Sequence, residues 1–178
     1  MDVVRDGPHR TKTDVRYEQL KFLLVDDNAH MRALLTELLK ALGCREIHEA
    51  ADGADGLQAL RNHPVDIVIT DLSMEPLDGV EFVRLLRNSP DSPNPMIPVI
   101  MITGHATERR VGEARDVGVN EFLAKPITAT GVTGRIARVI EHNRDFIRTE
   151  DYFGPDRRRR ADPRFGGPFR RSGDSQKG

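Results

Sequence analysis

The chain has 178 residues, of which 38% are hydrophobic and 31% charged, and its formal net charge is −1. This length allows one domain with a hydrophobic core and short extensions rather than two full domains. The near-neutral charge excludes a chain that is basic throughout, and the single cysteine, Cys44, excludes a disulfide framework or a cysteine-based zinc site. We expect no membrane insertion, because no apolar run approaches the roughly 20 residues that cross a bilayer. With no secretory signal pattern at the start, a cytoplasmic location is expected.

The charge is unevenly distributed along the chain. Residues 21–147 carry 14 basic and 19 acidic side chains, a net charge of −5, whereas residues 148–178 carry nine basic and five acidic ones, a net charge of +4. The tail therefore differs in electrostatic character from the middle of the chain. Apolar runs alternate from Lys21 onward, and we expect a folded domain over residues 20–145. The flanking segments, an N-terminal extension over 1–19 and an Arg/Gly/Pro-rich tail over 146–178, show no core-forming period and are expected to be flexible and disordered.

Strand and helix patterns alternate through the first half of the domain. A short apolar run at 22–25 predicts a buried strand. The apolar residues that follow recur three and four positions apart, which predicts one inward face of a helix. That face consists of Met31, Leu34, Leu35, Leu38, Leu39 and Leu42. A weaker strand at 47–50, a short helix at 53–62 and a β-branched strand at 65–70 follow.

The second half continues the same alternation. A helix is predicted over 79–87, a strand over 99–102 after a Pro-rich loop, and a mostly polar helix over 106–117. A fifth strand over 119–123 and a last helix over 128–147 complete the pattern.

The composition of the strands predicts the fold class. Apolar strands without alternating polar residues are typical of a parallel sheet that is covered on both faces. Right-handed crossovers between them then give a doubly wound α/β fold with a five-stranded parallel sheet. In such a fold, the ligand site lies beyond the carboxyl ends of the strands.

The residues at those strand ends form one chemical set. They are Asp26, Asp27, Asp71, Thr103 and Lys125. Three neighbouring carboxylates repel one another, and a divalent cation such as Mg²⁺, which prefers oxygen ligands, would remove that repulsion. A cation and an ammonium group around a carboxylate can stabilise a transferring phosphoryl group. Asp71 is then the candidate nucleophile, forming an aspartyl phosphate.

Four sequence segments resemble the receiver domain of two-component response regulators, in particular the chemotaxis-type single-domain regulators. The matching text is LLVDDN, IVITDLSMEPLDG, VIMITG and EFLAKPI, together covering about residues 20–145. The spacing of these residues also resembles that of the family. Asp71 follows Asp27 by 44 positions, Thr103 follows Asp71 by 32, and Lys125 follows Thr103 by 22. The resemblance implies a flavodoxin-like receiver fold.

The resemblance also implies a role for each strand-end residue. Asp26 and Asp27 would hold Mg²⁺, and Asp71 would be the phosphoacceptor and a further metal ligand. Thr103 would be the switch hydroxyl that moves toward the phosphoryl group. Lys125 would be the phosphate-binding ammonium, followed by a proline whose peptide bond is usually cis in the family.

Three further positions have roles implied by the resemblance. Ser73 sits where the family supplies a backbone carbonyl to the metal. Phe122 takes the place of the aromatic switch residue, whose ring would move inward with Thr103. His105, like Ser73, flanks the phosphoryl group at a position that tunes dephosphorylation, although an exposed bystander is an equally good interpretation of this histidine.

We interpret the chain as a stand-alone response regulator. It would accept a phosphoryl group on Asp71 from a histidine kinase or a histidine phosphotransfer protein, and present a changed surface to an unknown output protein. This is self-modification with slow hydrolysis, not conventional enzyme activity. No helix-turn-helix pattern follows residue 147, so no sequence-specific DNA-binding domain is expected. The alternative is an adaptor whose arginines at 157–160 bind a partner or nucleic acid independently of phosphorylation.

Overall fold

The computed structural model describes residues 15–104, 107–141, 145–149 and 151–157. Within these residues, one sheet contains five parallel strands in the order β2-β1-β3-β4-β5. Its strands are β1 (Lys21–Val25), β2 (Glu46–Ala50), β3 (Ile67–Asp71), β4 (Val99–Thr103) and β5 (Glu121–Ala124). The doubly wound five-stranded parallel sheet predicted from the sequence is therefore confirmed.

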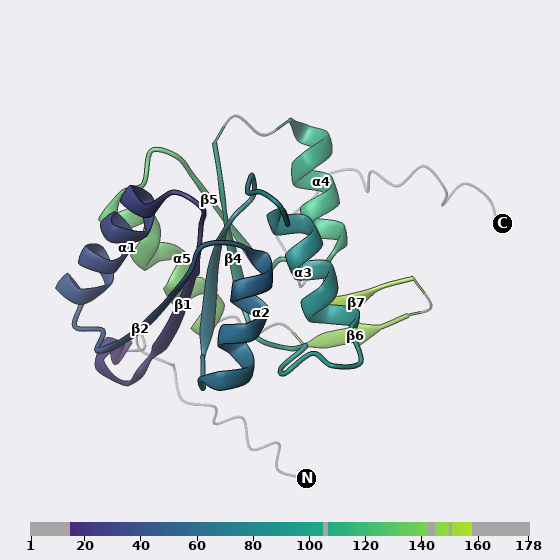
Figure 1. Cartoon of the computed structure of the whole chain (residues 1–178), viewed down its shortest axis with the longest axis horizontal. Coiled ribbons are helices and arrows are strands. Elements are labelled where there is room, and N and C mark those ends of the chain that lie inside the picture. Colours follow the sequence, from purple (N-terminus) through teal and green to yellow (C-terminus); the bar gives the residue numbers. More distant parts are fainter. Residues whose placement is uncertain (1–14, 105–106, 142–144, 150, 158–178) are drawn as a thin grey trace, which may run out of the picture.

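Helices cover both faces of this sheet (Figure 1). They are α1 (Ala29–Ala41), α2 (Gly53–Asn62), α3 (Gly79–Asn88), α4 (Glu108–Asp116) and α5 (Ala129–Glu141). Because successive side chains of a strand point to opposite faces, the core divides into two clusters. Leu23 and Val25 of β1 pack with α2, α3 and α4, whereas Phe22 and Leu24 pack with α1 and α5.

Side-chain caps fix the start of four helices just after the loops that leave the strands. Asn28 accepts a hydrogen bond from the backbone N–H of His30, and Asp52 accepts one from Asp55. The remaining caps are Asp78 at α3 and Thr107 at α4. Each cap satisfies backbone donors that the first helical turn leaves unpaired, so each polar residue marks where a helix begins.

Two helices differ from their sequence patterns. On α1, Leu35 and Leu39 are buried, but Leu34 is 44% exposed, so the inward face is narrower than predicted. The described part of the last helix runs to Glu141, and the helix does not continue to 147, because the chain at 146–148 forms a strand. No helix in the described part of the chain is both long and apolar enough to cross a membrane.

The expectation of disordered extensions is wrong for the described residues of both flanking segments. Strands β6 (Phe146–Arg148) and β7 (Phe153–Pro155) pair antiparallel as a hairpin. The hairpin is ordered because Gly154 and Pro155 are buried and the rings of Phe146 and Phe153 pack against each other in a tilted arrangement, with centroids 5.6 Å apart. At the other end, the short 3₁₀ helix η1 (Tyr17–Gln19) contributes a partly buried Tyr17 to the core. The expectations for 1–14 and 158–178 lie outside the described residues.

Candidate functional site

The carboxylate of Asp71 is at the centre of the site. Asp71 is the last residue of β3, and it is only 5% exposed. Its Oδ1 atom lies 3.1 Å from Nζ of Lys125, and its Oδ2 atom accepts a hydrogen bond of 3.0 Å from the backbone N–H of Ser73. Each carboxylate oxygen therefore has one positively polarised partner, which holds the side chain in a fixed orientation.

Sheet register brings Thr103 and Lys125 to this carboxylate. In the pairing of β3 with β4, Asp71 lies opposite Ile102, so Thr103 continues the same edge one residue further on. The backbone N–H of Lys125 donates to the carbonyl oxygen of Thr103 at 2.8 Å, and the Lys125–Pro126 peptide bond is cis, as the resemblance implied. The predicted convergence of Asp71, Thr103 and Lys125 at one edge of the sheet is thus seen in the structure.

A close backbone approach behind the site depends on Gly79. The N–H of this first residue of α3 donates to the carbonyl oxygen of Leu72 at 3.0 Å. A Cβ atom on Gly79 would collide with the carbonyl oxygen of Asp71 and lie 3.0 Å from Cα of Leu72. Glycine is therefore required for α3 to begin against the end of β3. This glycine ends the motif IVITDLSMEPLDG, and its position directly after the Asp78 cap was the available signal for its role.

Asp26 has an incomplete set of partners. The residue is 2% exposed, and its Oδ1 atom accepts a hydrogen bond of 2.8 Å from the backbone N–H of Asn28. Its Oδ2 atom is buried and has no hydrogen-bond partner among the described residues. Burial raises the pKa of the Asp26 carboxyl, and the neighbouring carboxylates of Asp71 and Asp27 raise it further, against the opposing effects of Asn28 and Lys125. A buried acceptor left in this way is expected where a cation belongs.

The residues present fit a magnesium ion better than a metal that needs a full protein cage. No group of three or more His, Cys, Asp or Glu among the described residues is arranged as a metal site. Mg²⁺, however, is usually held by one or two carboxylates together with water molecules. Asp26 and Asp71, whose charges influence one another, can supply that pair, and the partnerless Oδ2 atom of Asp26 is available to a cation.

The other predicted site residues lie at varied distances from this centre in the fold. Asp27 follows Asp26 in the loop after β1 and is exposed at the rim. Phe122 lies on β5, opposite Met101 of β4, and its half-buried ring packs against the core cluster that contains α3. His105 lies outside the described residues, so its predicted tuning role stays a prediction.

One buried polar residue was missed entirely by the sequence analysis. Arg87, near the end of α3, is 1% exposed and donates hydrogen bonds to the carbonyl oxygens of Gly118 and Pro95 and to Oδ1 of Asn120. It lies at the amino ends of β4 and β5, on the edge of the sheet opposite Asp71. The helical pattern gave no signal for it, because an arginine on an amphipathic helix is normally exposed.

Comparison with known proteins identifies the family. The model of the response regulator receiver domain matches residues 22–137. The chain is 33% identical over 124 residues to the chemotaxis protein CheY-3 of Vibrio cholerae, which covers 70% of this chain and 94% of that protein. It is 34% identical over 122 residues to the chemotaxis protein CheY of Pseudomonas aeruginosa, covering 68% and 97% of the two chains. These relatives lend no support to the adaptor alternative.

Solved structures agree with this assignment. The chemotaxis protein CheY4 of Vibrio cholerae superposes with a TM-score of 0.62 at 29% identity, covering 67% of this chain and 98% of that one. The receiver domain of the sensor histidine kinase PA1611 from Pseudomonas aeruginosa, solved with a magnesium ion coordinated in its active site cleft, superposes with a TM-score of 0.59 at 26% identity. It covers 67% of this chain and 94% of that one. The chain therefore belongs to the response regulator receiver domain family.

Proposed function

We propose that Asp71 accepts a phosphoryl group from a phosphohistidine, carried by a histidine kinase or a histidine phosphotransfer protein, in a reaction that requires Mg²⁺. One observation carries this proposal. The buried Asp71 carboxylate lies 3.1 Å from the Lys125 ammonium, beside the Asp26 carboxylate whose Oδ2 atom has no partner among the described residues. If Lys125 only had to neutralise the charge of Asp71, the fold would not need the Asp26 carboxylate, with its unpartnered oxygen, beside it.

The proposed chemistry follows from the partners of each oxygen. An Asp71 oxygen attacks the phosphorus atom of the phosphohistidine, an O–P bond forms, the P–N bond breaks, and the released imidazole takes up a proton. The Lys125 ammonium offsets the negative charge of the transferred group, and the Thr103 hydroxyl donates a hydrogen bond to one of its oxygens. Asp26, Asp27, Asp71 and the backbone carbonyl of Ser73 would hold Mg²⁺, which would neutralise part of the negative charge of the site during transfer.

The proposed switch uses Thr103 and Phe122. Hydrogen bonding to the phosphoryl group favours one position of the Thr103 side chain, and the half-buried Phe122 ring on the neighbouring strand follows it inward. Contacts made only in the phosphorylated state then shift the population toward a surface that an output protein recognises. The reaction modifies the chain itself, so each molecule is phosphorylated once per cycle.

Intact mass measurement after incubation with acetyl phosphate and Mg²⁺ tests the acceptor. The wild-type chain should gain the mass of one phosphoryl group, and Asp71→Asn should gain none, because an amide is not a nucleophile toward phosphorus. Asp91→Asn, which removes an exposed carboxylate in the loop before β4, is the matched control and should behave as the wild type. An Asp71→Asn chain that gained the same mass would refute the assignment.

Lys125 offers a second test of the same site. Lys125→Ala should leave the fold intact, since the side chain is 36% exposed, but should slow phosphorylation of Asp71 by about tenfold or more through loss of charge stabilisation. The rate of mass gain at a fixed acetyl phosphate concentration measures this effect. An unchanged rate would mean that Lys125 has no part in the transfer.

A further inference from the structure

Helix α4 is weakly anchored to the rest of the domain. Of its residues Glu108–Asp116, all of which the structure describes, only Ala114 is buried. A helix with so little apolar contact gains little stability from packing and depends on interactions at its ends. At its beginning, Arg110 binds Oδ2 of Asp78, the residue that caps α3, at 2.8 Å.

The hairpin β6–β7 holds the other end of α4. Arg157, two residues beyond β7, places its guanidinium 2.9 Å from the Oδ1 atom of Asp116, and it donates a second hydrogen bond of 3.1 Å to the carbonyl oxygen of the same residue. The guanidinium also lies 3.8 Å from the centroid of the Tyr152 ring. The last residue of α4 is therefore bound through both its side chain and its backbone.

The hairpin is itself fixed to the body of the domain. A Cβ atom on Gly154 would lie 2.8 Å from Cα of Gly118 and 2.6 Å from the Tyr152 hydroxyl oxygen, so the two backbones touch where Gly154 is. Gly118 has a φ of +99°, a conformation that favours glycine. Beneath this contact, the buried Arg87 binds the Gly118 carbonyl oxygen and stacks on Phe146, 5.0 Å from the ring centroid.

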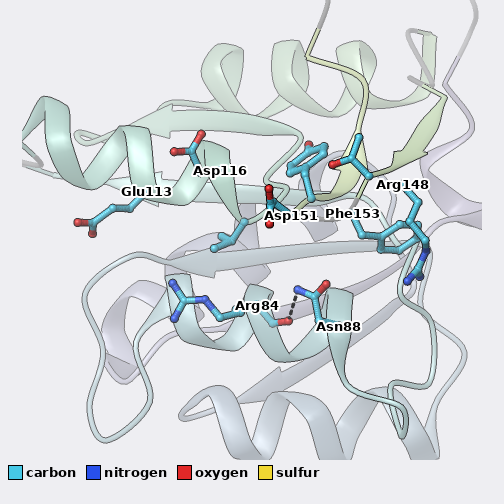
Figure 2. Close-up of a pocket in the computed structure, with 10 residues that line it drawn as sticks. Arg84, Asn88, Glu113, Asp116, Arg148, Asp151 and Phe153 are labelled. Atoms are coloured by element: carbon cyan, nitrogen blue, oxygen red, sulfur yellow. Dashed lines mark hydrogen bonds between the residues drawn. The ribbon is translucent and has the colours of Figure 1, made fainter.

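Open space lies next to this end of α4. A pocket of about 530 Å³ separates α3 from α4 beside the hairpin (Figure 2). Figure 2 shows Glu113 and Asp116 of α4 on one side of the pocket and Arg84 and Asn88 of α3 on the other. Because Ala114 is the one buried residue of α4, few packing contacts oppose a shift of the helix into this space once its end contacts are released.

We propose that the β6–β7 hairpin is an intramolecular clamp that holds α4 in the unphosphorylated arrangement and thereby opposes phosphorylation of Asp71. The inference rests on the proposed function of Asp71. Thr103 ends β4, and Thr107, which caps α4, follows it four residues later in the sequence, so a movement of Thr103 toward a phosphoryl group acts close to the start of that helix. Contacts that exist in only one arrangement stabilise it, and by linkage their removal favours the other.

Hydrogen exchange of the full, unphosphorylated chain tests the structural half of the proposal. Arg157→Ala removes the ion pair and the carbonyl contact, and it should speed exchange of the α4 amides about threefold, the effect of losing one partly exposed ion pair. Gly154→Val, which prevents the backbone contact with Gly118, should have a larger effect. Arg148→Ala is the matched control, because this guanidinium lies over Phe153 of the hairpin itself, and it should leave α4 unchanged.

The rate of phosphorylation by acetyl phosphate and Mg²⁺ tests the regulatory half. Arg157→Ala and Gly154→Val should gain the phosphoryl mass faster than the wild type, by the same factors as their exchange rates, while Arg148→Ala should match the wild type. Faster exchange with an unchanged or slower phosphorylation rate would overturn the clamp as a regulatory device, and unchanged exchange in Arg157→Ala would overturn it as a clamp.

A failure of the proposed function can be told apart from these outcomes. If the wild-type chain gains no phosphoryl group at Asp71, the acceptor assignment fails, whereas the exchange rates of α4 still report whether the hairpin holds it. If Gly154→Val does not fold, as a thermal melt would show, Arg157→Ala decides the result alone, because its side chain is on the surface.

Discussion

The two edges of the sheet bury charge in opposite ways. At the carboxyl edge, Asp26 is 2% exposed and has a carboxylate oxygen with no partner among the described residues. At the amino edge, Arg87 is 1% exposed, and its guanidinium donates to two backbone carbonyl oxygens and the side-chain oxygen of Asn120. Burial raises the pKa of Asp26 and lowers the pKa of Arg87 to about 10, so both charges are costly to bury.

This difference distinguishes a buried charge that stabilises the fold from a buried charge that is suited to bind a ligand. A buried charge whose donors are all used stabilises the fold, since removing it leaves acceptors unpaired. A buried charge with an unused oxygen is unfavourable in the protein alone and is relieved only when a ligand supplies the missing partner. By this criterion, the amino edge holds the hairpin and the loop before β5 together, and the carboxyl edge is where we propose that a cation and a phosphoryl group bind.

Replacement of Arg87 should give the largest loss of stability. Arg87→Met keeps the length of the side chain but leaves the carbonyl oxygens of Gly118 and Pro95 without their donors, which should lower the free energy of unfolding by about 3 kcal/mol. Urea denaturation measures this. Arg84→Met, one turn earlier on the exposed side of α3, should change stability by less than about 0.5 kcal/mol. Equal effects from the two variants would contradict the distinction between the two edges.

A methyl group at Gly79 should destabilise the opposite edge. Gly79→Ala forces α3 away from the carbonyl oxygen of Asp71 and should cost about 2 kcal/mol, with slower phosphorylation because the acceptor is displaced. Gly134→Ala, at a position on α5 where a Cβ atom meets nothing within 4 Å, should instead stabilise the chain by about 0.5–1 kcal/mol. Thermal melts of both variants measure the two changes in stability. Melting temperatures that shifted in the same direction would contradict the prediction.

Neutralising Asp26 should have the smallest effect, and in the stabilising direction. Asp26→Asn removes a buried charge and its repulsion with Asp71 while keeping an oxygen to accept from Asn28, so the free energy of unfolding should rise by about 1 kcal/mol at neutral pH. In the presence of Mg²⁺, the wild type should gain more stability than the variant, because the ion binds only the folded state. A variant less stable than the wild type without Mg²⁺ would show that the charge is already compensated.

The pH dependence of the stability of the wild type and of Asp26→Asn gives an independent check. Because the pKa of Asp26 is raised in the folded state, the folded chain keeps this proton to a higher pH than the unfolded chain does. Stability of the wild type should therefore decline as pH rises from near 3.8, the ordinary value, through the raised pKa. Asp26→Asn should lack that decline, and parallel stability profiles for the two chains would exclude the expected shift.

Most of the carboxyl edge could be predicted from the sequence because its residues follow strands that the apolar pattern identifies. Asp71, Thr103 and Lys125 are each within two residues of a predicted strand end, and parallel strands bring such ends to one edge. The apolar pattern could not predict which hydrogen-bond partners each side-chain atom would have. One oxygen of Asp26 has no partner among the described residues because of the local course of the backbone at Asn28. The spacing of apolar residues along the sequence does not describe that local course.

The amino edge could not be predicted, because its order comes from contacts distant in sequence. The segment at 146–157 has no period of its own, and its glycine, proline and charged residues are typical of disordered tails. It folds because Gly154 fits against Gly118 and because Arg87, 59 residues before Phe146, provides a cation beneath that ring. A single exposed-looking arginine on an amphipathic helix gives no indication of either contact.

The position of the hairpin also bears on how the domain should be delimited in experiments. The family match ends at residue 137, before the hairpin begins at Phe146. A fragment that ended at the family boundary would lack Phe146, whose ring packs against the Arg87 guanidinium, and would expose the backbone at Gly118 to solvent. Such a shortened protein would misrepresent the native molecule in solubility screens and binding assays alike, even if the carboxylates of Asp26 and Asp71 kept their arrangement.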